Sequence, residues 1–173
     1  QILYWTDIER GRLFRYTPKT GKHEPFYQGE RVGGFTLQTD GSLLLFQENK
    51  FSRLDGNGKM EVLARDIDDG MERFNDVITD PRGRVFAGTC AQNAQSGGLY
   101  RVDTNGQATR LFLGTGCSNG MAFTRDQKQF FWTCTTTRKI FRFDYHAESG
   151  ELSNRRVFLD VPAAEGYPDG MTI

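Results

Sequence analysis

Three oxygen-bearing side chains recur at one position of a repeated pattern. Asn75 stands in Arg-Phe-Asn-Asp, Asn119 in Ser-Asn-Gly-Met and Asp169 in Pro-Asp-Gly-Met, each opening an apolar, strand-like stretch. They are separated by 44 and 50 residues. A single asparagine there is usually a turn residue, but three in register favour a shared site. Two amide oxygens and one carboxylate form a hard donor set suited to one divalent cation: calcium, magnesium, manganese or loosely held zinc.

A four-strand unit repeats along the chain. A strand ending in Arg-x-Asp or a close variant occurs four times, and its arginines are separated by 38, 48 and 41 residues: Arg15, Arg53, Arg101 and Arg142. Each copy is followed by a turn rich in glycine and polar residues, and then by another strand. In the second, third and fourth units, two strands joined by a turn precede the strand that carries this arginine. Four strands in roughly 40 to 50 residues are typical of a β-propeller blade.

We therefore predict an all-β chain with one β-propeller domain over 1–173. The expected blades cover about 1–30, 31–68, 69–115 and 116–162, and a fifth begins at 167–173. Because a propeller stopped there would expose unpaired strand edges, we expect the chain to be part of a longer protein. A β-sandwich also uses many short strands, but it gives no reason for the same four-strand order to recur.

The propeller arrangement predicts where the three polar side chains meet. The first strand of each blade lines the central channel, so Asn75, Asn119 and Asp169 are expected to converge from successive blades. The second blade has Gly33 and Gly34 at the equivalent place. The site is therefore expected on one side of the channel.

Composition gives no sign of a macromolecular partner or a membrane. The chain has 22 basic and 22 acidic residues, so no net field favours nucleic acid or an anionic surface. Its apolar runs fall well short of the roughly 20 residues that a membrane helix needs. We expect a small-molecule partner, with no nucleic acid and no membrane. The sequence predicts no oligomeric state.

Cysteine and histidine usage narrows the possible chemistry. Cys90, Cys117 and Cys134 are an odd number without metal-type spacing, so we expect no disulfide framework and a reducing compartment, hence a cytoplasmic protein. The chain also starts without an initiator methionine or a signal peptide. His23 and His146 fall in or beside outer hairpin turns, which leaves a Ser–His–Asp relay without a base. We also expect the cysteines to have no catalytic role, because no histidine is placed to activate their thiols.

Several motifs in order resemble the SMP-30/gluconolactonase/luciferin-regenerating enzyme family. They are Arg-Phe-Asn-Asp at 73–76, Asp-Pro-Arg-Gly-Arg at 80–84, Phe-Ala-Gly-Thr at 86–89, Ser-Asn-Gly at 118–120, Ser-Asn-Arg-Arg at 153–156 and Pro-Asp-Gly-Met at 168–171. The resemblance implies a six-bladed propeller that binds one divalent metal ion in its channel and hydrolyses sugar lactones or related esters.

The resemblance also implies roles for particular residues. Asn75, Asn119 and Asp169 would be metal ligands, Asp169 would also be the acid–base group, and Arg73 would bind substrate. The family's fourth ligand, a glutamate, would precede the first residue of this chain. Some members use an acidic residue after the Gly-Thr strand to contact substrate, and Gln92 or Asn93 would be its neutral substitute here.

Two other functions remain open from the sequence. The run Tyr-Trp-Thr-Asp at 4–7 resembles the motif of extracellular receptor-type propellers that bind protein ligands. It occurs once, whereas those proteins tend to repeat it in successive blades, and this interpretation leaves the three polar residues without a purpose. The other is a regulatory, metal-binding family member without turnover, which the neutral residues at 92 and 93 leave open. For Arg73, a salt bridge to Glu72 or Asp76 is the structural alternative to substrate binding.

Overall fold

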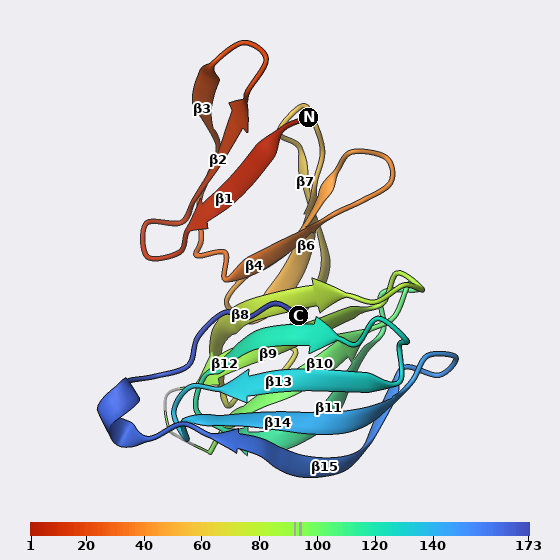
Figure 1. Ribbon diagram of the computed structural model, residues 1–173. Coiled ribbons are helices and arrows are strands. Elements are labelled where there is room, and N and C mark those ends of the chain that lie inside the picture. Colours follow the sequence, from red (N-terminus) through yellow and green to blue (C-terminus); the bar gives the residue numbers. More distant parts are fainter. Residues whose placement is uncertain (92, 94) are drawn as a thin grey trace.

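Strands in chain order form the first two sheets of the protein. The computed structural model (Figure 1) describes residues 1–91, 93 and 95–173. All pairings within the sheets are antiparallel between neighbours in sequence. The first sheet contains β1 (Leu3–Asp7), β2 (Arg12–Thr17) and β3 (Lys22–Gln28). The second contains β4 (Gly34–Leu37), β5 (Leu43–Phe46), β6 (Lys50–Leu54) and β7 (Met60–Arg65).

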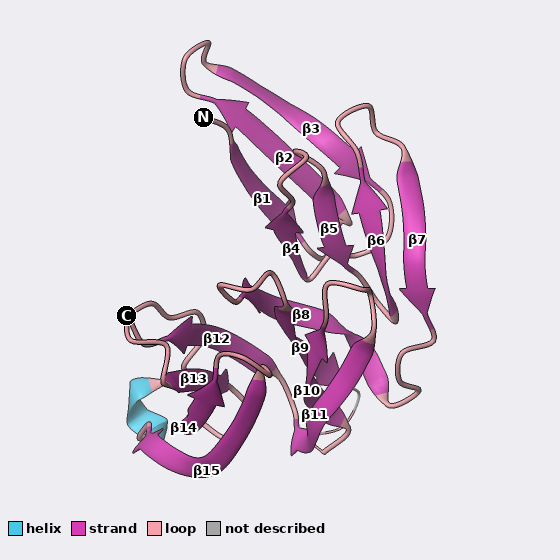
Figure 2. Ribbon diagram, turned by 90° about the vertical axis from the view of Figure 1, so that its right-hand side faces the viewer, coloured by secondary structure: helices cyan, strands magenta, loops and turns pink. Residues whose placement is uncertain are grey.

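The third and fourth sheets repeat this arrangement. The third contains β8 (Met71–Thr79), β9 (Val85–Ala91), β10 (Gly97–Val102) and β11 (Ala108–Thr115). The fourth contains β12 (Ser118–Phe123), β13 (Gln129–Cys134), β14 (Lys139–His146) and β15 (Glu151–Asp160), followed by the short 3-10 helix η1 (Ala163–Glu165). The first strands β4, β8 and β12 contact one another in succession, and the sheets fan outward from them (Figure 2). The prediction of an all-β fold with about four propeller blades is confirmed.

Hairpin turns are fixed by aspartate side chains and glycine. Asp80 Oδ1 accepts hydrogen bonds from the backbone N–H groups of the residues two and four positions later, and Gly83 in the same turn has φ of 82°. Asp55 accepts the same two bonds in its turn, where Gly58 has φ of 84°. Glycine adopts this left-handed backbone without a Cβ clash. The turn signals in the sequence therefore position the hairpins as predicted.

Apolar clusters between neighbouring sheets form the core. Six fully buried aromatic side chains fill the two larger clusters: Phe46, Phe51 and Phe74 between the second and third sheets, and Phe86, Phe130 and Trp132 between the third and fourth. Burying a side chain of this kind contributes roughly 1.5–3 kcal/mol relative to exposure. The same packing holds the inner strands β8 and β12 next to each other.

A buried polar network fastens the third sheet to the fourth. Asp80 Oδ2 accepts hydrogen bonds from Arg84 Nε at 2.6 Å and from the Tyr145 hydroxyl at 2.8 Å. Arg84 also donates to the backbone carbonyls of Ala147 and Glu148, at 2.5 and 2.9 Å. The Asp80 side chain is fully buried and that of Arg84 is 8% exposed. Because buried charges need full pairing, this network fixes the relative position of the two sheets.

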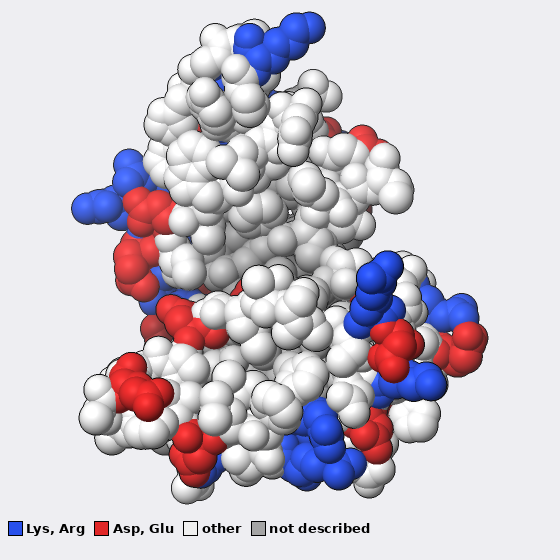
Figure 3. Space-filling view, in the orientation of Figure 1, with Lys and Arg blue, Asp and Glu red and all other residues white. Residues whose placement is uncertain are grey.

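The C-terminal segment lies beside the inner strands of the third and fourth sheets. Residues 167–173, where a fifth blade is predicted to begin, form no strand in the described chain, and they end beside β8 and β12 (Figure 1). Basic and acidic side chains lie interspersed around the rim of the face shown in Figure 3. Among the described residues, no helix has the length and apolar character needed to cross a membrane.

Candidate functional site

Asn75 and Asn119 both lie at irregularities in their strands. The prediction that Asn75 opens its strand is wrong, because β8 already begins at Met71. In β8, Asn75 and Asp76 together oppose one residue of β9, and the register of β12 slips in the same way just after Asn119. A bulge bends the strand and re-aims the side chains at that point. Two neighbouring blades therefore use the same backbone device to direct an asparagine.

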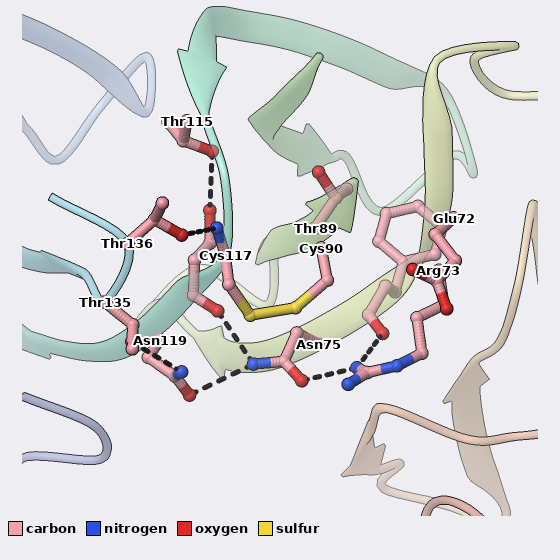
Figure 4. Close-up of a disulfide and its surroundings, with 12 residues drawn as sticks. Glu72, Arg73, Asn75, Thr89, Cys90, Thr115, Cys117, Asn119, Thr135 and Thr136 are labelled. Carbon is pink, nitrogen blue, oxygen red and sulfur yellow. Dashed lines mark hydrogen bonds between the residues drawn. A yellow bond between two sulfur atoms is a disulfide. The ribbon is translucent and has the colours of Figure 1, made fainter. Parts of the chain in front are cut away.

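Three of the predicted residues form a continuous row of hydrogen bonds that ends at Thr135 (Figure 4). Arg73 Nη1 donates to Asn75 Oδ1 at 2.5 Å. Asn75 Nδ2 donates to Asn119 Oδ1 at 3.0 Å and to the Ser118 carbonyl at 2.8 Å. Asn119 Nδ2 donates in turn to Thr135 Oγ1 at 2.8 Å. Every amide hydrogen bond in this row runs in one direction, so each amide oxygen is turned away from Thr135 and keeps one lone pair free.

Arg73 has no carboxylate partner among the described residues. The structural alternative was a salt bridge to Glu72 or Asp76, but Glu72 pairs with Arg31, at 3.0 Å. Arg73 instead bonds through Nη1 to the Phe74 carbonyl and to the neighbouring asparagine amide. Burial lowers the pKa of its guanidinium, which nevertheless stays charged at neutral pH. Its Nε and Nη2 donate to no described residue, so they are available to a ligand.

A cavity of about 480 Å³ brings the predicted residues together. Three sequence segments supply most of its lining: Arg73, Asn75, Asp76, Cys117, Asn119 and Asp169. Asn75 is buried, Arg73 and Asn119 are half-buried, and Asp169 is exposed at the mouth. The expectation that oxygens from separate blades meet at one place therefore agrees with this geometry, while their roles as ligands stay a prediction.

Asp76 is a site residue that sequence reasoning treated only as a partner for Arg73. Burial raises the pKa of its carboxyl, a hydrogen bond from the Val77 N–H lowers it, and the negative charge of Asp169 raises it again. Two carboxylates thus face one cavity and repel each other. A bound cation would relieve this repulsion, and the donors are all hard oxygens. The residues present fit a divalent metal ion.

The one-sidedness of the site has a steric cause. A Cβ at Gly33 would lie 1.9 Å from the Phe74 carbonyl oxygen and 2.9 Å from Asn75 Cα. The second blade therefore approaches the third so closely that only glycine fits at this position. This contact accounts for the absence of a polar ligand from the second blade.

The expectation of unpaired cysteines is wrong for two of the three. Cys90, at the end of β9, forms a disulfide with Cys117, and their Cα atoms are 4.1 Å apart (Figure 4). The two residues also pair as an isolated β-bridge, because the loop before β12 folds back along β9. Cys134 is free and buried, as expected. The bridge removes the cysteine argument for a reducing compartment, and the cytoplasmic location stays a prediction.

The expected substrate contacts at 92 and 93 are not part of this cavity as described. Gln92 lies outside the described residues. Asn93 is exposed, and its Oδ1 accepts hydrogen bonds from the backbone N–H groups of Gln95 and Ser96, each at 3.0 Å. Both substrate-binding assignments stay predictions. The two histidines do lie away from the cavity: His23 is on β3, and His146 is the last residue of β14.

Comparison with known proteins decides the family. A family model described as SMP-30/Gluconolactonase/LRE-like region matches residues 1–173. The chain belongs to this family. A pentonolactonase of Haloferax volcanii is 45% identical over 171 residues, and a 6-deoxy-6-sulfogluconolactonase of Pseudomonas putida is 31% identical over 175 residues. These alignments cover 99% and 98% of this chain.

A solved structure named luciferin-regenerating enzyme supports the same fold. It superimposes with a TM-score of 0.89 at 25% identity, over 100% of this chain and 62% of that one. The two lactonases are covered over 58% and 60% of their lengths, so the chain spans about three fifths of the relatives it matches. Two of the named relatives are lactonases and the third is named as an enzyme, so the receptor-type interpretation of the Tyr-Trp-Thr-Asp run is not favoured.

The donor set differs from common metal centres. The described residues contain no cluster of three or more His, Cys, Asp and Glu side chains that could hold a metal ion. Amide oxygens supply half of the polar lining that could act as ligands, namely Asn75 and Asn119 beside Asp76 and Asp169. The in-register asparagines of the sequence point to this site, because two of its four candidate oxygen donors are neutral amides.

Proposed function

We propose that the protein is a divalent-metal-dependent lactonase that hydrolyses sugar lactones. The observation that carries this proposal is the convergence of Asn75, Asn119 and Asp169 on one cavity beside Arg73, which pairs with no carboxylate in the described part of the chain. Membership of a family with lactonase relatives supports the reaction class. The pentonolactonase and sulfogluconolactonase names support a small polyhydroxylated lactone as substrate.

The metal ion, calcium, magnesium, manganese or zinc, would be held by Asn75, Asn119 and Asp169. When bound, it supplies Lewis acidity that polarises the lactone carbonyl and favours the negative charge that develops there. Asp76 adds negative charge to the same cavity and so favours cation binding.

The remaining steps belong to side chains of the chain. Asp169 takes a proton from the attacking water as the new C–O bond forms at the carbonyl carbon. It returns that proton to the ring oxygen as the ester bond breaks, which leaves a hydroxy acid. Arg73 offers Nε and Nη2 to substrate oxygens in a fixed fork, while its contact with Asn75 keeps the guanidinium in place. This contact links substrate orientation to the asparagine row.

Ligand replacement in the full-length protein tests the proposal. We expect Asn119→Ala and Asp169→Ala to weaken metal binding by more than the 10- to 100-fold typical of groups behind a ligand. Lactone hydrolysis should fall in parallel. Calorimetry with calcium, manganese, magnesium and zinc gives the affinities, and a pH-indicator assay with pentonolactones and gluconolactones gives the rates.

Matched controls separate loss of the site from loss of the fold. Asn57 and Asp69 are exposed, and neither side chain makes a hydrogen bond to a described residue. Asn57→Ala and Asp69→Ala should therefore leave metal binding and turnover unchanged. Unchanged turnover in both Asn119→Ala and Asp169→Ala would reject the assignment. Metal binding without turnover on any lactone would indicate a regulatory protein instead.

A further inference from the structure

One hydroxyl group connects two of the candidate metal ligands. Thr135 directly follows β13 and begins the turn into β14. Its Oγ1 accepts a hydrogen bond from Asn119 Nδ2 at 2.8 Å and donates one to the carbonyl oxygen of Pro168, also at 2.8 Å. Both bonds are short and use the donor and an acceptor lone pair of the hydroxyl. Thr135 thus joins the side chain of one candidate ligand to the peptide that precedes the other, Asp169.

The backbone of Thr135 is itself held in place. Its N–H donates to the Cys117 carbonyl at 3.0 Å, and its carbonyl accepts from the Arg138 N–H at 3.0 Å to close the turn. Cys117 is tied to β9 through the disulfide with Cys90. The hydroxyl therefore projects from a fixed frame, and its position does not depend on the C-terminal segment.

The C-terminal segment, in contrast, has few attachments. Among the described residues, the bond from Thr135 is the one hydrogen bond that joins residues 167–173 to the rest of the chain. Packing contacts also support it: Arg138 lies over the Tyr167 ring, and the Asp169 carbonyl and Met171 lie against Gly120. Thr135 thus supplies the hydrogen bond among the described contacts that hold Asp169 near Asn75 and Asn119.

We propose that Thr135 is a positioning residue for the metal site. By accepting from Asn119 Nδ2 it turns the amide oxygen of Asn119 toward the cavity, and by donating to Pro168 it brings Asp169 to the same cavity. The catalytic meaning of this proposal rests on the lactonase function proposed above, whereas the hydrogen-bond link itself does not. Groups that orient metal ligands typically change affinity by 10- to 100-fold when removed.

Three variants of the full-length protein test this role. Thr135→Val keeps the shape and removes the hydroxyl, and Thr135→Ser restores the hydroxyl without the methyl group. Thr137→Val is the control, because it removes a hydroxyl from the same turn. That hydroxyl donates to the Cys134 carbonyl at 3.4 Å and contacts neither candidate ligand. We expect Thr135→Val to bind manganese about 10- to 100-fold more weakly. Thr135→Ser should recover most of that loss, and Thr137→Val should match the wild type.

The metal dependence of turnover distinguishes positioning from a general loss of structure. In Thr135→Val, the manganese concentration for half-maximal lactone hydrolysis should rise by the same 10- to 100-fold as the binding constant. Saturating metal should then restore much of kcat. Equal metal affinity in Thr135→Val and Thr137→Val would overturn the positioning role.

A metal-free measurement keeps the link separate from the proposed function. In a proton–nitrogen NMR spectrum of the metal-free protein, the side-chain amide signal of Asn119 is the one lost in Asn119→Ala. It should shift or broaden in Thr135→Val and stay in place in Thr137→Val. An unmoved signal in Thr135→Val would overturn the link, whatever the activity. A wild-type protein that neither binds metal nor hydrolyses lactones would overturn the proposed function, even with a shifted signal.

Discussion

Loss of the Asp80 carboxylate should destabilise the protein far more than loss of an exposed ion pair. Asp80 receives hydrogen bonds from Arg84 and Tyr145 in a buried position between the third and fourth sheets. In Asp80→Ala, the Arg84 guanidinium stays buried without its counterion. The hairpin turn also loses the two hydrogen bonds that backbone N–H groups donate to Asp80 Oδ1. Removing one partner of a buried ion pair costs about 3–5 kcal/mol. We expect a loss in this range.

Removal of smaller parts of the network should cost less. Tyr145→Phe removes the hydrogen bond that the hydroxyl donates to Asp80 and the one that it accepts from Arg84 Nη2 at 3.2 Å, but it leaves the ion pair intact. We expect it to cost about 1.5–3 kcal/mol. The double variant Asp80→Ala/Arg84→Ala should cost less than the sum of the two single variants, because neither charge is then left buried alone. Urea unfolding of the full-length protein, followed by tryptophan fluorescence, gives the free energies.

An exposed ion pair on the same two hairpins provides the control. Arg82 contacts the Glu148 carboxylate, and the Glu148 side chain is 86% exposed. Glu148→Ala should change stability by no more than about 0.5 kcal/mol, since exposed pairs contribute little. Its backbone carbonyl still accepts from Arg84 in the variant. A loss below about 1 kcal/mol in Asp80→Ala, or simple additivity in the double variant, would refute the reasoning.

Three further predictions concern the site and its surroundings. The disulfide between Cys90 and Cys117 closes a sequence separation of 27 residues. From the entropy of closing such a loop, Cys90→Ser/Cys117→Ser should lower the free energy of unfolding by about 3.5 kcal/mol. Equal unfolding midpoints before and after reduction of the wild type would contradict this. Arg73→Met should raise KM for lactones. Metal affinity, measured by calorimetry, should stay near that of the wild type, because Asn75 is the one candidate ligand to which Arg73 donates a hydrogen bond among the described residues. The hydrogen bond from Tyr100 is the main cause that lowers the pKa of Asp68. The stabilisation that this bond provides is therefore present above the ordinary pKa of an aspartate and is lost as pH falls through the depressed value. Tyr100→Phe should be most destabilising at neutral pH and least in acid, and a loss of stability independent of pH would count against this cause.

Much of the fold follows from local sequence signals. The aspartate and glycine turns, such as Asp80 with Gly83, are completed within a few residues, so their hairpins can be read from the chain. The repeated strands then pair with their sequence neighbours. The contact between Asn75 and Asn119 could also be predicted, because equivalent positions of successive blades lie next to each other in a propeller.

Features that depend on contacts between blades could not be predicted in this way. The pairing of Cys90 with Cys117 requires the loop before β12 to fold against the end of β9, and cysteine parity carries no information on that path. The start of β8 at Met71 was missed because the bulge at Asn75 and Asp76 interrupts the two-residue alternation by which a strand is recognised in a sequence. Thr135 gave no signal, since its two partners are distant in sequence.

The tight contact at Gly33 limits how the pocket can be redesigned. Any side chain there would displace the Phe74 peptide, and with it the asparagine that follows. A redesign of ligand preference should therefore leave Gly33 unchanged and vary a lining residue outside this contact, such as Ile8. The close approach of two backbones at Gly33 thus limits which cavity residues can be replaced.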